Sequence, residues 1–254
     1  DVIEFQNSNL YINGKPEAIL GDEDQQRAYV IQSRGEIDID NLFKKFGSIA
    51  INDIKPNLRF DEEYFKKYKI NPQNYNYRMV LSKAILNDLK ANRDIISIQQ
   101  EIEVKGSGKP QYYPKYDENG YVTTDENNKI IYSKKIDTAS SIFPINKNWN
   151  IHWYGPIRIP KKGDVVTLNQ ETLPTYKWII SEYEHHHLQN IDGKIMIDGK
   201  ETNKYTIQQD YYMMCGDNRD SSLDARFFGF VPEENIVGSP MFTWLSLQGV
   251  SAFK

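Results

Sequence analysis

An approximate internal repeat built around tight turns constrains the fold most. Residues 1–5 and 9–15 resemble residues 164–168 and 194–200. Each copy ends in a short apolar run followed by Asn13-Gly14 or Asp198-Gly199. These dipeptides enter a type I′ turn at low steric cost, so the sequence predicts a β-hairpin in each copy. The second copy carries an insertion, residues 171–188, whose apolar residues recur at helical spacing.

The stretch between the two copies alternates between strand and helix patterns. Strands are predicted over residues 28–32, 75–81 and 95–104, and helices over residues 40–46, 61–68 and 82–92. Asp40 is predicted to cap the first helix, Ser82 the third, and Gly47 to stop the first. The last strand, helix and strand resemble a small βαβ unit, and residues 116–122 with 129–132 suggest a hairpin. The remainder is strand-rich with frequent turns, which predicts a mainly β fold with an α+β elaboration rather than a doubly wound one.

Composition excludes several classes of protein. The 254 residues include 31 Lys and Arg against 35 Asp and Glu, a net charge of −4, so no basic field favours nucleic acid. A single cysteine, Cys215, rules out an intramolecular disulfide, and with four histidines it leaves no cysteine-rich zinc framework. No apolar run approaches the ~20 residues of a membrane span.

Residues 216–232 are the most informative segment. They hold three aspartates, two arginines and two serines between aromatic flanks. A turn with surface salt bridges is the simplest explanation of such a cluster. A calcium loop starting at Asp217 is not supported, because the pattern fails at Arg219, Ser222 and Phe228, and the two arginines compete for the carboxylates. No metal site is therefore expected.

This segment, Gly-Asp-Asn-Arg-Asp-Ser-Ser-Leu-Asp-Ala-Arg-Phe-Phe-Gly-Phe-Val-Pro, resembles the C-terminal signature of the bacterial type I signal peptidases. The family pattern is Gly-Asp-Asn-Arg-x-x-Ser-x-Asp-Ser-Arg followed by two aromatics and Gly-x-Val-Pro. Residues 236–238 and 241–245 are similar to the family's sequence immediately after this signature. Residues 1–5 with 9–16 look like the stretch after the family's Lys-Arg box, which closes on Pro-Gly-Asp. The resemblance implies a signal-peptidase-like β core of coiled sheets and hairpins in residues 1–18 and 151–254, with residues 19–150 as an inserted α+β subdomain.

The resemblance also implies roles for individual residues. Members of this family are membrane-anchored serine endopeptidases that remove signal peptides with a serine nucleophile and a lysine general base, without a cofactor. By position, Ser222 would supply a hydroxyl that orients the lysine, and Asp224 with Arg226 would form a supporting ion pair. Ala225 replaces the usual serine between them. The residues expected to hold the loop are Gly216, Asp217, Asn218 and Arg219.

The family's boxes for the nucleophile and the base are not found in these 254 residues, and we expect both to precede Asp1. The catalytic residues are therefore unknown, and the chain alone is predicted to be inactive. Its parent is expected in the bacterial cytoplasmic membrane, anchored by a missing N-terminal span, with this part on the outer or periplasmic face. The expected substrate is the signal-peptide region of a preprotein, and the oligomeric state is not predicted. A non-catalytic homologue that binds a partner through its insertion is the alternative.

Other candidate sites have simpler explanations. His185, His186 and His187 are predicted to lie at a solvated helix end, because consecutive helical side chains diverge by about 100°. His152 is expected to be packed or on the surface, and Cys215 to be a small buried residue. Lys161 and Lys162 are expected to be surface charges. The residues Phe242, Trp244 and Phe253 fit either a membrane-facing lip or core packing.

Overall fold

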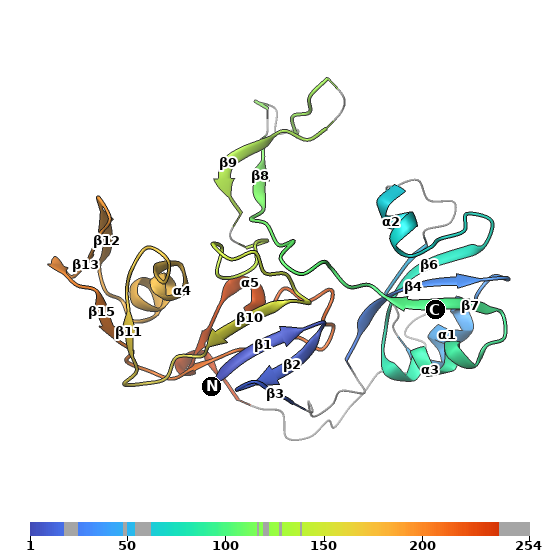
Figure 1. The fold of residues 1–254 in the computed structure, drawn as a ribbon, viewed down its shortest axis with the longest axis horizontal. Coiled ribbons are helices and arrows are strands. Elements are labelled where there is room, and N and C mark those ends of the chain that lie inside the picture. The colour runs from blue at the N-terminus through green and yellow to red at the C-terminus, as the bar shows by residue number, and fades with distance from the viewer. Residues whose placement is uncertain are drawn as a thin grey trace, which may run out of the picture. The chain divides into compact units, whose positions relative to one another are not determined.

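The computed structural model describes residues 1–17, 25–47, 50–53, 62–115, 117–118, 122–126, 129–137 and 139–238. The chain divides into two compact units. The first unit comprises Asp1–Glu17, Glu103–Gly216 and Leu223–Val237, and the second comprises Ala18–Ile102, Asp217–Ser222 and Gly238–Lys254. Both are rich in strands (Figure 1), which confirms the mainly β fold class. The aromatic residues proposed for a membrane-facing lip lie outside the described residues.

The first repeat copy forms the predicted hairpin. Its sheet has the order β10-β1-β2-β3 and contains β1 (Val2–Gln6), β2 (Asn9–Ile12), β3 (Lys15–Pro16) and β10 (Tyr154–Arg158). All neighbours in this sheet are antiparallel. Asn13 and Gly14 have φ of 51° and 76°, as a type I′ turn between β2 and β3 requires.

The second copy repeats the turn but not the strand pairing. Asp198 and Gly199 have φ of 50° and 79° between β13 (Lys194–Ile197) and β14 (Lys200–Glu201). However, β11 (Val165–Thr167) pairs with β15 (Lys204–Thr206), and β13 pairs with β12 (Leu188–Ile191). The helical insertion separates β11 from β13 along the chain. It forms α4 (Leu173–Trp178), which continues as a π-helix (Ile179–Tyr183).

The remaining elements of the first unit are short. They are β8 (Tyr112–Pro114), β9 (Tyr132–Ile136), β16 (Tyr211–Tyr212), α5 (Ala225–Phe228), β17 (Val231–Pro232) and a 3₁₀ helix (Glu233–Asn235). The sequence predicts a hairpin from residues 116–122 and 129–132, but the paired strands are β8 and β9, which lie outside those ranges except at Tyr132. Thr124 and Ile130 form an isolated bridge nearer the tip, and residues 116 and 119–121 lie outside the described residues. The first unit has a hydrophobic core in which Tyr154, Ile179, Ile180 and Ile207 are almost fully buried, and Tyr211 of β16 packs in it.

The second unit has a four-stranded sheet of the order β5-β6-β4-β7. Its elements are β4 (Arg27–Ser33), α1 (Ile39–Phe46), β5 (Ala50–Asp53), α2 (Glu62–Lys67), β6 (Tyr75–Leu81), α3 (Lys83–Ala91) and β7 (Ile95–Gln100). All neighbouring strands are antiparallel, so β4-α1-β5 and β6-α3-β7 each join parallel strands that flank a third. Two interleaved split βαβ units define a ferredoxin-like topology, to which α2 is an addition.

The two faces of this sheet are covered differently (Figure 1). Helices α1 and α3 pack on one face, where Ile31 and Met79 are fully buried. On the opposite face, Val30 packs with Tyr68 and Ile70, which follow α2.

The helix ends of the second unit correct two local predictions. Asp38 rather than Asp40 caps α1, and its carboxylate accepts a hydrogen bond from Asn41 N at 2.9 Å. Gly47 ends this helix with φ of 82°, as predicted. Ser82 occupies the N-cap of α3, but its side chain makes no capping hydrogen bond. Lys83 is the first residue of that helix and directly follows the cap position.

Candidate active-site support loop

A buried ion pair organises the C-terminal half of the signature. Arg226 is fully buried, and its guanidinium donates two hydrogen bonds to Asp224, from Nε to Oδ1 at 2.9 Å and from Nη2 to Oδ2 at 2.8 Å. The side chain of Asp224 is 7% exposed. Arg226 also donates from Nη1 to the Ile151 carbonyl at 3.4 Å. This bidentate geometry fixes both side chains in one orientation.

Asp224 also anchors the backbone on both of its sides. As the N-cap of α5 it accepts from Arg226 N at 3.1 Å, and its Oδ2 accepts from Gly216 N at 3.1 Å. Burial alone raises the pKa of Asp224, but the hydrogen bonds and charge of Arg226 outweigh it and hold this pKa below its ordinary value. The carboxylate is therefore ionised and neutralised in place.

The first half of the signature belongs to the second unit. Residues 217–219 form a short parallel bridge with the chain just before β4, through Gln26 and Asn218. Arg219 is buried, Asp217 is exposed, and Ser221 N donates to Asn218 O at 3.1 Å, which closes a turn. Ser222 follows this turn and is half-buried.

Asp220 is a structural residue that the sequence did not indicate. Its side chain is 2% exposed, and its Oδ2 accepts from Ala28 N at 2.6 Å. The family pattern leaves this position unspecified, and the two residues are 192 positions apart. No local pattern signals such a contact.

Three other polar residues of the first unit are Tyr154, Cys215 and His152. The Tyr154 hydroxyl has no hydrogen-bond partner among the described residues, and burial raises its pKa well above the ordinary value. The thiol of Cys215 adds to this shift. Cys215 is half-buried rather than buried, and it packs against the core. His152 is packed, one of the two expected placements, and its Nδ1 accepts from Glu103 N at 3.2 Å.

The three consecutive histidines lie beyond the end of the helix. The π-helix ends at Tyr183, and His185 has a positive φ of 56°. His186 is hydrogen-bonded through Nδ1 to Asp198 Oδ2 at 2.6 Å, so it is held in place rather than free in solvent. Within the residues that the structure describes, no three His, Cys, Asp or Glu side chains are grouped as metal ligands would be.

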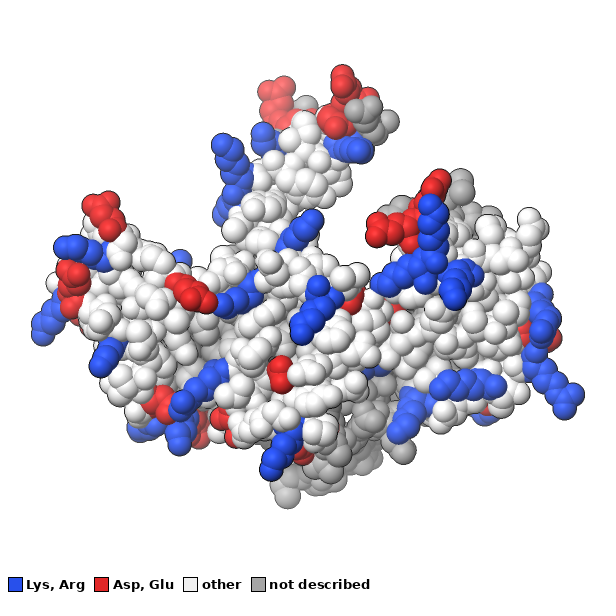
Figure 2. Space-filling view, viewed as in Figure 1, with Lys and Arg blue, Asp and Glu red and all other residues white. Residues whose placement is uncertain are grey.

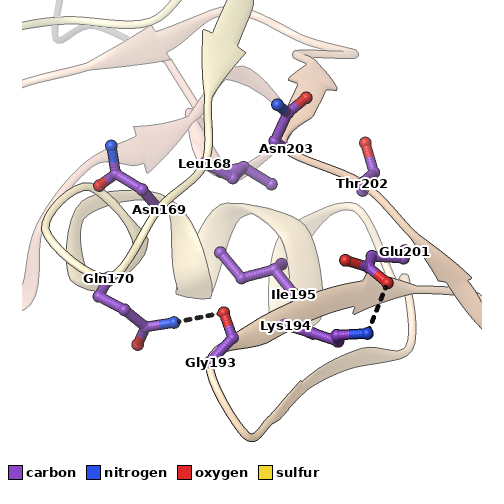
Figure 3. A pocket seen from close by; sticks show the side chains of 9 residues that line it. All are labelled: Leu168, Asn169, Gln170, Gly193, Lys194, Ile195, Glu201, Thr202 and Asn203. Atoms are coloured by element: carbon purple, nitrogen blue, oxygen red, sulfur yellow. Dashed lines mark hydrogen bonds and ion pairs between the residues drawn. The ribbon is translucent and has the colours of Figure 1, made fainter.

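Two of the pockets among the described residues lie in the first unit. One, of about 610 Å³, is lined by polar residues together with Leu168 and Ile195 (Figure 3). Gln170 Nε2 donates to Gly193 O at 3.1 Å, and Lys194 Nζ lies 3.5 Å from Glu201 Oε2. None of its lining residues belongs to the signature. The other, of about 370 Å³, is apolar and is lined in part by Phe143, Trp178, Phe227 and Phe228, so it borders α5.

The surface carries charges of both signs. Lysine and arginine side chains are spread over the face shown in Figure 2, together with aspartates and glutamates. Lys161 and Lys162 are exposed, as expected. Among the described residues, no helix has the length and apolar character that crossing a membrane requires.

Comparison with known proteins identifies relatives over parts of the chain. The family model "Signal peptidase, peptidase S26" matches residues 154–245. The chain is similar to signal peptidase I of Haemophilus influenzae, with 32% identity over 126 residues, which are 47% of this chain and 33% of that protein. It is also similar to signal peptidase I of Aquifex aeolicus, with 28% identity over 169 residues, 61% of this chain and 59% of that protein. The chain thus spans from about a third to three fifths of these two relatives, and no solved structure matches it. These matches confirm the resemblance to the signal peptidase family, peptidase S26, that residues 216–232 indicate, and the family model covers residues 154–245 of this chain.

Proposed function

We propose that this chain is the part of a signal peptidase I that supports the catalytic serine and lysine, and that the complete protein removes signal peptides from exported preproteins. The observation that carries this proposal is the buried Asp224–Arg226 pair within the signature, two residues after Ser222. We further propose residues 1–18 and 151–254 as the family's β core and residues 19–150 as an insertion.

The proposed chemistry uses a serine nucleophile and a neutral lysine. The lysine amine takes the proton of the serine hydroxyl as the serine oxygen attacks the scissile carbonyl. The scissile C–N bond then breaks, and the leaving amine takes the proton from the lysine. The neutral lysine next takes a proton from water, which attacks the acyl-enzyme and releases the carboxylate product and the serine. The Ser222 hydroxyl orients the amine without adding charge. A free carboxylate nearby would raise the pKa of the lysine and keep it protonated. Pairing with Arg226 neutralises Asp224 and removes that effect.

The nucleophile and the base are proposed to come from parts of the protein outside these 254 residues. Neither a Ser-Met-x-Pro box nor a Lys-Arg box closing on Pro-Gly-Asp occurs in the sequence. The chain alone is therefore proposed to be inactive, and the complete protein to act at the outer face of the cytoplasmic membrane, without a cofactor.

The test is a cleavage assay with a preprotein-derived peptide. The complete protein should cleave it and the present chain should not. Ser222→Ala should lower kcat by about tenfold to a hundredfold, because a misoriented base loses most of its effect. Ser221→Ala is the matched control, since its exposed side chain lies next to Ser222, and it should leave kcat unchanged. A complete protein without cleavage activity would favour the non-catalytic homologue.

A further inference from the structure

The signature loop replaces β7 along one edge of β4. The β4–β7 pairing reaches Tyr29 and Gln100, and Glu101 N then donates to Ala28 O at 2.8 Å. Alternate residues of a strand direct their N–H and C=O groups to the same side, so Gln26 and Ala28 both face this edge.

Residues 217–220 bind the groups that β7 leaves unused. Gln26 N donates to Asp217 O at 2.8 Å, and Arg219 N donates to Gln26 O at 3.1 Å. The last group, Ala28 N, is taken by the side chain of Asp220 at 2.6 Å. The loop is thus bound to the sheet as a short edge segment.

Asp220 is the strongest of these anchors. Its carboxylate is almost fully buried, and its Oδ1 lies 3.9 Å from Arg27 Nη1. Arg27 is itself held by Gln25, whose buried Oε1 accepts from Arg27 Nη2 at 3.1 Å. A hydrogen bond from a backbone N–H to a carboxylate is roughly twice as strong as one between neutral groups.

We propose that Asp220 is a positioning residue for Ser222 and acts through the edge of β4. This inference rests on the function proposed above. Ser222 lies two residues after Asp220 and two before Asp224, and both carboxylates are buried and immobilised. A hydroxyl that orients a catalytic amine must be held within about 0.5 Å. These two anchors, on either side of Ser222 along the chain, restrict its backbone.

The anchor is tested in the present chain by amide hydrogen exchange. Ala28 and Arg219 amides should be protected, and Asp220→Ala should speed their exchange at least tenfold while amides of β6 keep their rates. Asp220→Asn should give an intermediate effect, because its side-chain oxygen still accepts a hydrogen bond. The control is Asp164→Ala, which removes a carboxylate 14% exposed that pairs with Arg158 in the first unit. Free-peptide exchange rates at Ala28 and Arg219 in the unmodified chain would overturn the proposal.

The positioning role is tested in the complete protein by steady-state kinetics. Asp220→Ala should lower kcat at least tenfold with KM within twofold, and it should cost nothing further in a Ser222→Ala background, because the two residues act as a unit. Asp164→Ala should leave kcat unchanged. Additive losses from Asp220→Ala and Ser222→Ala would show that Asp220 does not act through Ser222. If the unmodified complete protein is inactive, the proposed function fails, and hydrogen exchange still decides whether Asp220 anchors the loop.

Discussion

Replacing Arg226 with methionine should destabilise the first unit strongly. Methionine retains an unbranched apolar stem but removes the two guanidinium hydrogen bonds to Asp224. Arg226 is 0% exposed and Asp224 7%, so water does not replace the lost partner. Hydrogen bonds to charged groups contribute about 1.5–3 kcal/mol each, and breaking a buried pair costs about 3–5 kcal/mol. We expect the free energy of unfolding to fall by about 4 kcal/mol at pH 7.

The loss should depend on pH with a defined sign. In the unmodified chain the pKa of Asp224 is lowered, so its stabilisation is complete above the unfolded pKa of about 3.9 and disappears as pH falls through the folded pKa. In Arg226→Met, burial acts without the guanidinium and raises this pKa above the unfolded value. The penalty is then absent below about pH 3.9 and grows as pH rises through the raised pKa. The difference between the two proteins should shrink from pH 7 toward pH 4.

Urea unfolding followed by tryptophan fluorescence measures this effect. Three of the four tryptophans, Trp149, Trp153 and Trp178, lie in the first unit, so a Trp244→Phe background makes the signal specific to that unit. Asp224→Asn combined with Arg226→Met should recover most of the loss, because no unpaired charge remains. A loss below about 1 kcal/mol at pH 7, or one independent of pH, would refute the role assigned to this pair.

Four further substitutions test the packing. Tyr154→Phe should leave the first unit equally stable or about 1 kcal/mol more stable, because it removes a buried hydroxyl without a described partner, and a clear loss in the same fluorescence assay would contradict this. Gly155→Ala should cost about 3 kcal/mol, because φ is 87° and a Cβ would lie 2.7 Å from Ile3 O. Gly163→Ala, with φ of 85° and open space around it, should cost only about 1 kcal/mol, and equal losses would refute the steric argument. Ile31→Ala should lower the stability of the second unit by about 3 kcal/mol, measured by exchange of β4 amides, and an unchanged rate would show that this core is not as described.

The sequence predicted features that depend on neighbouring residues. The turns at Asn13-Gly14 and Asp198-Gly199 follow from residues that tolerate positive φ, and both occur. The strand and helix over residues 75–92 follow from periodicity, and they also occur, although the Ser82 side chain makes no capping hydrogen bond. Where two nearby residues compete, the local signal is insufficient. Asp38 and Asp40 both suit an N-cap, and only the backbone geometry selects Asp38.

Pairings between distant segments could not be predicted. The repeat suggested equivalent hairpins, but the α4 insertion lets β11 pair with β15, whereas β1 pairs with β2. The candidate site shows the same division. Asp224 and Arg226 are two residues apart in a recognisable pattern, whereas the partner of Asp220 lies in β4, 192 residues earlier, where no motif marks it.

The two buried aspartates of the signature, Asp220 and Asp224, are immobilised by partners of different origin. The partner of Asp224 is Arg226, which the signature itself contains, so this anchor needs no side chain from outside the signature. The partner of Asp220 is a backbone amide of the second unit, so this anchor exists only where that sheet is present. Exchanging residues 19–102, which lie in the second unit, for another domain should therefore leave the Asp224–Arg226 pair intact and release the Asp220 side of the loop. A stable exchanged protein with an unchanged exchange rate at the Arg219 amide would show that the loop holds its shape without the sheet.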